Sequence, residues 1–133
     1  MWHDLTSEQE LLRDTTSRYL ADKASLAKQR KMRDDPQGFA PGYWTGGAEL
    51  GWTMLLASEE DGGGSVSGRG LVDLAMLAYE FGKNAAPGPL VDCNVAVLAL
   101  GEQQRHGGQA RAGVLGHFWA MISAGAWAFC FHP

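Results

Sequence analysis

The segment from Leu71 to Phe81 constrains the fold most, because its apolar residues recur at steps of three and four. The members of this stripe are Leu71, Leu74, Ala75, Leu77, Ala78 and Phe81. Asp73 and Glu80 interrupt it, as expected of a helix with one buried face. Gly82 and the Pro87-Gly88-Pro89 turn end it, since proline removes a hydrogen-bond donor and restricts its predecessor. We therefore predict an amphipathic helix that needs a partner.

Two further segments predict helices that contribute to the core. From Leu90 to Gly101 nearly every residue is apolar, so we expect a core helix lying centrally between others. Near the N-terminus, Thr6 with Gln9 and Ser7 with Glu10 have the spacing of a capping box, which satisfies free amides at a helix start. The residues expected to form the core face of that helix are Leu11, Leu12, Thr15, Tyr19, Leu20 and Ala24.

Between the N-terminal helix and the central one, the sequence predicts a solvated turn and a short helix. The basic run from Lys28 to Arg33 is followed at once by two aspartates and a proline, which is typical of an exposed helix end rather than a phosphate-binding patch. A short helix is predicted from Tyr43 to Leu50, with Trp44, Leu50 and Trp52 as large apolar anchors.

The connection that follows is irregular. The apolar run 52–57 leaves two structures open, an extended segment or a buried connection. The glycine-rich stretch 62–70 is the natural place to look for phosphate chemistry, since glycine lets backbone amides approach an anion. Gly63 and Gly68 have P-loop spacing, but Arg and Gly follow where Lys and Ser or Thr are needed. We interpret this stretch as a linker.

Size and composition predict one folded domain, and the helices predicted above make it an all-α domain. The chain has 133 residues, 45% of them hydrophobic and 20% charged. A net charge of -4 without a basic stripe indicates neither a nucleic-acid partner nor a membrane surface. Cys93 and Cys130 make neither a disulfide framework nor a thiolate zinc site. The acidic N-terminus lacks a signal-peptide pattern, so we expect a cytoplasmic protein.

The sequence offers no recognisable catalytic or metal-binding constellation. His106 and His117 are eleven residues apart, so helical spacing does not place them on one face. The acidic turn 59–61 is expected to be solvated, and Glu80 to be exposed or salt-bridged rather than a general base. We assign no catalytic residue and no metal ligand.

Five short motifs, in the right order and at domain-like spacing, resemble the N-terminal helical domain of the acyl-CoA dehydrogenases. The motifs are Leu5-Thr6-Ser7-Glu8-Gln9, Glu49-Leu50-Gly51-Trp52, Glu59-Glu60-Asp61-Gly62-Gly63, Tyr79-Glu80-Phe81-Gly82 and Ala86-Pro87-Gly88-Pro89-Leu90. The resemblance covers residues 4–104, which we predict to be the helical domain, and leaves 105–133 as a divergent tail.

The resemblance implies both a fold and a function. Family members have an N-terminal helical domain, a middle β-domain and a C-terminal four-helix bundle, with FAD between the latter two and across a subunit interface. A carboxylate of the C-terminal domain removes the α-proton of an acyl-CoA thioester while a hydride passes from the β-carbon to the flavin. The N-terminal helices are expected to line the acyl-chain side of the substrate pocket and to leave redox chemistry to FAD.

The tail resembles the first strand of the middle domain from Gly125 to Cys130, where the family contributes flavin contacts. Phe129, Cys130 and Phe131 are therefore the candidate cofactor-binding residues, although Phe131 and His132 replace the family's hydroxyl and carboxylate. A strand without a sheet leaves backbone groups unpaired, so we expect a missing remainder or a partner. Of two alternatives, a natural short protein and a truncated or frame-disrupted product, we favour the second.

Three hypotheses for function follow. The first is a helical domain of FAD-dependent acyl-CoA dehydrogenase ancestry that is inactive alone, because it lacks the catalytic base and most of the flavin site. The alternative is a non-catalytic helical interaction module that pairs with a complete dehydrogenase subunit. A weaker hypothesis treats Val114 to Phe131, eighteen residues without a formal charge, as a membrane tail, whereas we expect a buried helix turn and a strand there.

Overall fold

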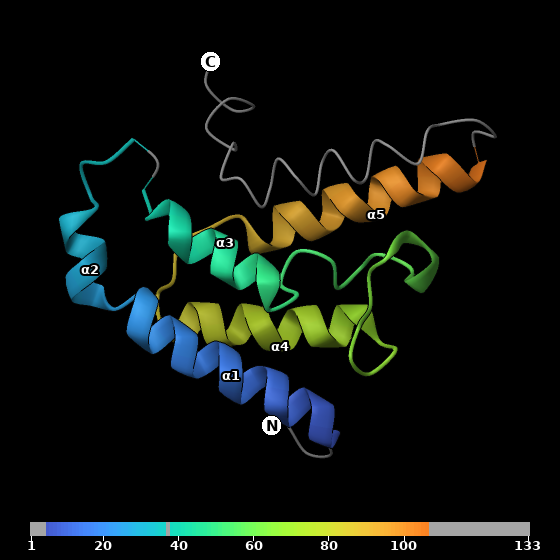
Figure 1. The fold of residues 1–133 in the computed structure, drawn as a ribbon, viewed down its shortest axis with the longest axis horizontal. Coiled ribbons are helices and arrows are strands. Elements are labelled where there is room, and N and C mark those ends of the chain that lie inside the picture. The colour runs from blue at the N-terminus through green and yellow to red at the C-terminus, as the bar shows by residue number, and fades with distance from the viewer. Residues whose placement is uncertain (1–4, 37, 107–133) are drawn as a thin grey trace.

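A computed structural model describes residues 5–36 and 38–106, and the regular secondary structure of this part of the chain is helical (Figure 1). The elements are, in order, α1 (Ser7–Lys23), α2 (Leu26–Lys31), α3 (Pro41–Glu49), the short 3₁₀ helix η1 (Glu59–Asp61), α4 (Gly70–Lys83) and α5 (Leu90–His106). The predicted all-α class is confirmed. The strand expected near the C-terminus lies outside the described residues.

The helices are arranged around α4. Figure 1 shows α4 between α1 on one side and α5 on the other, with α2 at one end of the bundle. The contacts agree, because α4 packs against both α1 and α5, and α1 also packs against α3. The most regular amphipathic segment of the sequence is therefore the centre of the domain.

The N-terminal capping box forms as its spacing predicts. The Thr6 hydroxyl accepts the Gln9 amide at 3.2 Å, and the Gln9 side chain accepts the Thr6 amide at 3.0 Å. Two acids in the first turn and Lys23 in the last complement the helix dipole. These local interactions begin α1 at Ser7.

Trp52 is the centre of the aromatic core. Its side chain is fully buried, and its ring lies 4.8 Å from that of Phe81 and 5.5 Å from that of Tyr19, measured between centroids. Both contacts are edge-to-face, the arrangement that aromatic quadrupoles prefer. The indole nitrogen donates to the Thr16 hydroxyl at 3.0 Å, so its polar atom is satisfied inside the core.

Two glycines allow the tryptophans to pack closely. A Cβ on Gly47 of α3 would lie 2.0 Å from the Trp52 ring. Gly88, in the turn before α5, has φ +124° and would place a Cβ 2.6 Å from Trp44. Trp44 is fully buried like Trp52, whereas Leu50, the third expected anchor, is only partly buried.

Several residues expected in the core are exposed instead. Leu11 is 67% exposed and Leu71 is 71% exposed. The buried side chains of α1 are Gln9, Thr16 and Leu20, a helical face on which Leu11 does not lie. Leu71 is in the first turn of α4, beside the preceding loop. The periodicity predicted the helices correctly but placed these residues on the wrong face.

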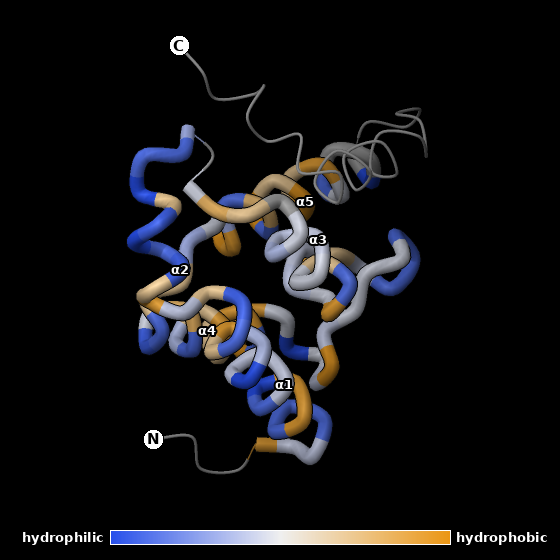
Figure 2. Tube along the Cα trace, turned by 60° about the vertical axis from the view of Figure 1, so that its left-hand side comes forward, coloured by the Kyte–Doolittle hydropathy of each residue, from blue (hydrophilic) through white to orange (hydrophobic). Residues whose placement is uncertain are grey.

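Outside this core, the polarity of each segment agrees with its exposure. Figure 2 shows hydrophobic residues concentrated on α4 and α5, whereas α2 is largely hydrophilic. Lys28, Arg30 and Lys31 are exposed and a turn follows α2, which confirms the solvated helix end. The run 52–57 is a buried connection of turns rather than a strand.

Candidate functional site

One side of α5 presents apolar side chains to solvent. Val91 is 49% exposed, Val95 is 53% exposed and Leu98 is 37% exposed. Steps of four and three place them along one side of the helix, which we call the α5 face. Within the described residues the prediction of a central core helix is wrong, because α4 packs on the other side of α5, which buries Cys93 and Val97.

Asn94 fixes the opposite side of α5 to the domain. Its side chain is fully buried, and its amide nitrogen donates to the Trp52 carbonyl at 2.7 Å and to the Leu90 carbonyl at 2.8 Å. Its oxygen accepts the Leu55 amide at 2.9 Å and the Leu56 amide at 3.4 Å. One side chain thus anchors the irregular connection and sets the rotation of α5. A lone Asn in an apolar run was the signal for this role.

A groove opens beside the C-terminal half of the α5 face. Its volume is about 600 Å³, within the range of small-molecule sites. Leu98 lines it, so the groove and the α5 face are continuous. Its apolar lining also includes Leu55, Leu56, Leu71 and Val72. Leu71 and Val72, at the start of α4, are exposed because they form part of the wall of this groove.

A buried carboxylate shapes the loop that closes one side of this groove. Asp73 accepts hydrogen bonds from the Gln9 side chain at 2.7 Å and from the Ser65 hydroxyl at 2.6 Å. The Ser67 amide and hydroxyl also donate to it, at 3.2 Å and 2.8 Å. Burial raises the pKa of Asp73, but these hydrogen bonds outweigh burial and hold the pKa below its usual value. The expected linker is therefore tied to α1 and α4.

The lining of the groove also includes three charged residues, Glu59, Arg69 and Arg105. Arg105, which lines the groove, lies 3.5 Å from the Asp61 carboxylate and also pairs with Glu102. The Ser58 hydroxyl caps η1 by accepting the Asp61 amide, and it donates to the Asp61 carboxylate at 2.7 Å. The groove therefore joins an apolar lining to a charged edge.

The glycine-rich loop before α4 gives no open site for the diphosphate of a flavin dinucleotide. Free amides at a helix start commonly bind phosphate, and this loop leads into α4 at Gly70. A Cβ on Gly70 would lie 2.4 Å from the Leu55 carbonyl oxygen, so this start is packed against another segment. The candidate flavin residues Phe129, Cys130 and Phe131 lie outside the described residues, and that assignment stays a prediction.

Two buried side chains that could be reactive, Cys93 and Glu80, are held in the core away from the groove. Cys93 is fully buried, and burial raises the pKa of its thiol to about 12, which keeps it protonated and unreactive. Glu80 is 4% exposed and its carboxylate lies 3.7 Å from the Lys83 ammonium, so the expected ion pair forms although the side chain is not solvated. Neither group reaches the groove.

The described part of the chain holds neither a metal-binding cluster nor a membrane-spanning helix. Among residues 5–36 and 38–106, no group of three or more His, Cys, Asp or Glu side chains is placed to hold a metal ion. Within the same residues, no helix has the length and apolar character needed to cross a membrane. The segment from Val114 to Phe131 lies outside them.

The family relationship follows from sequence comparison. Residues 6–113 match the family model of the acyl-CoA dehydrogenase N-terminal domain. The chain is 33% identical over 97 residues to acyl-CoA dehydrogenase IpdE2 of Mycolicibacterium smegmatis (strain ATCC 700084 / mc(2)155), an alignment covering 72% of this chain and 30% of the relative.

A second relative gives the same result. Over 94 residues the chain is 32% identical to acyl-CoA dehydrogenase IpdE2 of Mycobacterium tuberculosis (strain ATCC 25618 / H37Rv), covering 70% of this chain and 29% of that protein. The chain thus spans less than a third of the length of these relatives, and no solved structure matches it significantly. The helical architecture and the match over residues 6–113 show that the chain belongs to the acyl-CoA dehydrogenase family, through its N-terminal domain.

Proposed function

We propose that this chain is the acyl-binding helical domain of an FAD-dependent acyl-CoA dehydrogenase, and that the α5 face and its groove line the hydrocarbon part of the thioester substrate. The observation that carries the proposal is the row formed by Val91, Val95 and Leu98 on a helix whose other side is fixed by Asn94. An apolar helix face beside a groove lined by Leu55, Leu56, Leu71 and Val72 is what a hydrocarbon chain requires.

The energetics favour such a ligand. Covering the exposed parts of these three side chains with hydrocarbon contributes on the order of 2–3 kcal/mol, at about 25 cal/mol per Å² of apolar surface. A polar ligand gains less from these three side chains, because they offer it no hydrogen bond or opposite charge. The α5 face therefore discriminates by acyl group rather than by the CoA headgroup.

Redox chemistry is assigned to other parts of the enzyme. The buried carboxylates that the structure describes have structural partners, since Asp73 ties the loop and Glu80 pairs with Lys83. In this proposal the chain alone binds acyl-CoA without oxidising it. FAD, when bound by the remaining domains, supplies the acceptor for the hydride. A cytoplasmic location also remains part of the proposal, consistent with the protonated free thiol of Cys93.

The test compares acyl-CoA with CoA. Titration calorimetry of the purified chain is expected to show saturable binding of octanoyl-CoA and at least tenfold weaker binding of CoA. Replacing Val95→Glu is expected to weaken octanoyl-CoA binding about tenfold or more, because a carboxylate then faces the hydrocarbon. Leu11→Glu is the matched control, since Leu11 is an exposed leucine on α1 that does not line the groove. Equal affinity for CoA and octanoyl-CoA would contradict the proposal.

A turnover assay tests the second half of the proposal. The chain is mixed with FAD, octanoyl-CoA and a dye acceptor, and no dye reduction above the protein-free rate is expected. Stoichiometric FAD on the purified chain together with acyl-CoA-dependent dye reduction would refute the assignment of redox chemistry to other domains.

In the alternative, an interaction module, the α5 face contacts a protein subunit instead of an acyl chain. If the α5 face docks on a complete dehydrogenase subunit, Val95→Glu abolishes co-purification with that subunit and leaves octanoyl-CoA binding unchanged. Loss of acyl-CoA binding in the isolated variant favours the acyl-binding proposal instead.

A further inference from the structure

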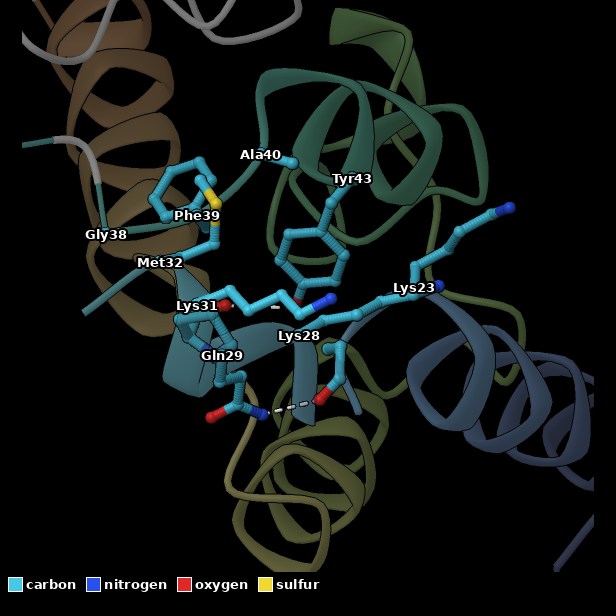
Figure 3. A pocket seen from close by; sticks show the side chains of 11 residues that line it. Lys23, Lys28, Gln29, Lys31, Met32, Gly38, Phe39, Ala40 and Tyr43 are labelled. Atoms are coloured by element: carbon cyan, nitrogen blue, oxygen red, sulfur yellow. Dashed lines mark hydrogen bonds between the residues drawn. The ribbon is translucent and has the colours of Figure 1, made fainter. Parts of the chain in front are cut away.

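A second pocket lies at the other end of the domain, where α2 meets α1 and α3. Figure 3 shows it from close by, with Met32 and Phe39 together on one side of the Tyr43 ring. Its volume is about 200 Å³. The pocket shares no lining residue with the groove, and nothing in the proposed dehydrogenase role uses it. We call it the α2 pocket.

The floor of the α2 pocket is apolar. Met32, Phe39, Ala24 and Ala40 line it, together with the ring of Tyr43. Tyr43 is 4% exposed, and its hydroxyl donates to the Pro87 carbonyl at 2.9 Å. Because the phenol hydrogen is already used, the ring presents its apolar surface to the pocket. The floor therefore offers a ligand hydrophobic contact rather than hydrogen bonds.

The rim of the pocket is cationic. Lys23, Lys28 and Lys31 all line it. Two of them share one acid, because the Asp22 carboxylate lies 2.9 Å from the Lys23 ammonium and 3.8 Å from that of Lys28. Among the described residues Lys31 has no ion-pair partner. Residues 22–35 hold five basic and three acidic side chains, a positive excess in a chain of net charge -4.

From an apolar floor under an incompletely neutralised lysine rim, we infer that the α2 pocket binds a small anionic amphiphile, with a carboxylate or phosphate head at the lysines and a short hydrocarbon chain over Tyr43. The floor selects the hydrocarbon, and the ammonium groups select the negative head. A hydrocarbon chain without a charge, or an anion without a chain, matches only one part of the pocket.

Volume limits the hydrocarbon chain. The pocket holds about 200 Å³, equal to roughly seven water-sized groups of ~30 Å³ each. That is below the ~300 Å³ typical of the smallest drug-sized sites. The ligand that fits carries about six to eight carbons.

The experiment is a heteronuclear NMR titration of the full chain with eight-carbon probes that differ only in their heads. Octanoate and octyl phosphate test the two anionic heads separately, octanol lacks the charge, and inorganic phosphate lacks the chain. Saturable shifts at residues 23–43 and next to Pro87, which also lines the pocket, are expected for one or both anionic amphiphiles. Octanol is expected to bind about tenfold more weakly or not at all, and inorganic phosphate to cause no saturable shift.

Paired charge variants separate the pocket from the general charge of α2. The double variant Lys28→Gln, Lys31→Gln is expected to weaken binding of the anionic probe about tenfold. The control, Arg30→Gln with Arg33→Gln, removes the same charge from exposed residues of the same segment that do not line the pocket. That control is expected to change affinity less than threefold.

A third variant tests the hydrophobic half. Ala40→Phe adds a ring at the floor without changing charge and is expected to abolish saturable shifts from octanoate. The inference is overturned if octanol binds as tightly as octanoate, if both double variants weaken binding equally, or if no probe gives saturable shifts at residues 23–43. These outcomes are independent of octanoyl-CoA binding at the α5 face.

Discussion

Replacing Asn94→Leu tests the anchor that orients α5. Leucine has a similar volume, so the change removes hydrogen bonds without opening a large cavity. The Trp52 carbonyl and the Leu55 amide, bonded at 2.7 Å and 2.9 Å in the native chain, then lose their side-chain partner in a buried site. Each unsatisfied group costs about 1–3 kcal/mol, so we expect a loss of about 4 kcal/mol in the free energy of unfolding.

That loss is large against the ~5–15 kcal/mol stability of a typical domain. At about 4 °C per kcal/mol, the melting temperature is expected to fall by ~15 °C. Urea unfolding followed by circular dichroism and by tryptophan fluorescence measures the change. Ala99→Leu, at an exposed position of α5, is the control and is expected to shift stability by less than ~0.5 kcal/mol. A loss below ~1 kcal/mol in Asn94→Leu would refute the anchoring role.

Three further predictions concern the core and its buried polar groups. Asp73→Asn is expected to make the free energy of unfolding less dependent on pH in acid. The pKa of Asp73 is lowered in the folded chain, so its carboxylate stabilises the fold fully above the unfolded pKa of ~3.9. That stabilisation is lost as pH falls through the folded pKa. Urea midpoints between pH 6 and pH 2.5 check this, and identical slopes in both proteins would count against it. Gly47→Ala is expected to destabilise the fold by ~1–3 kcal/mol, because the added Cβ collides with Trp52. Gly82→Ala has open space around its Cβ and is expected to stabilise the fold by ~0.5–1 kcal/mol. Thermal melts measure both, and equal effects would contradict the packing. In a Cys130→Ser background, Cys93 is expected to resist a thiol reagent at pH 8 until urea unfolds the chain, because burial raises its pKa to about 12; rapid reaction of the folded protein would disprove this.

Local patterns in the sequence predicted most of the helices. The Thr6 and Gln9 pair lies three residues apart, so the start of α1 depends on no distant part of the chain. The stripe before Pro87-Gly88-Pro89 similarly predicted α4, and the resemblance of five ordered motifs predicted the family that the comparison then showed.

The functional surface was harder to predict, because it depends on contacts between distant residues. The sequence of α5 is apolar on most sides, so periodicity did not reveal that Val91 and Val95 face outward. Asp73 was expected only as a break in an apolar stripe. It is buried instead, and it accepts a hydrogen bond from Gln9, 64 residues away. Such non-local partners leave no local pattern. The flavin contacts at residues 129–131 remain predictions.

The most direct test of the central claim is a methyl NMR titration of the chain with octanoyl-CoA, using selectively labelled valine and leucine. The account predicts saturable shifts at Val91, Val95 and Leu98 that CoA alone does not cause, while the methyls of Leu11 and Leu26, exposed residues that do not line the groove, stay unchanged. Shifts that omit the α5 face, or that CoA reproduces in full, would contradict it.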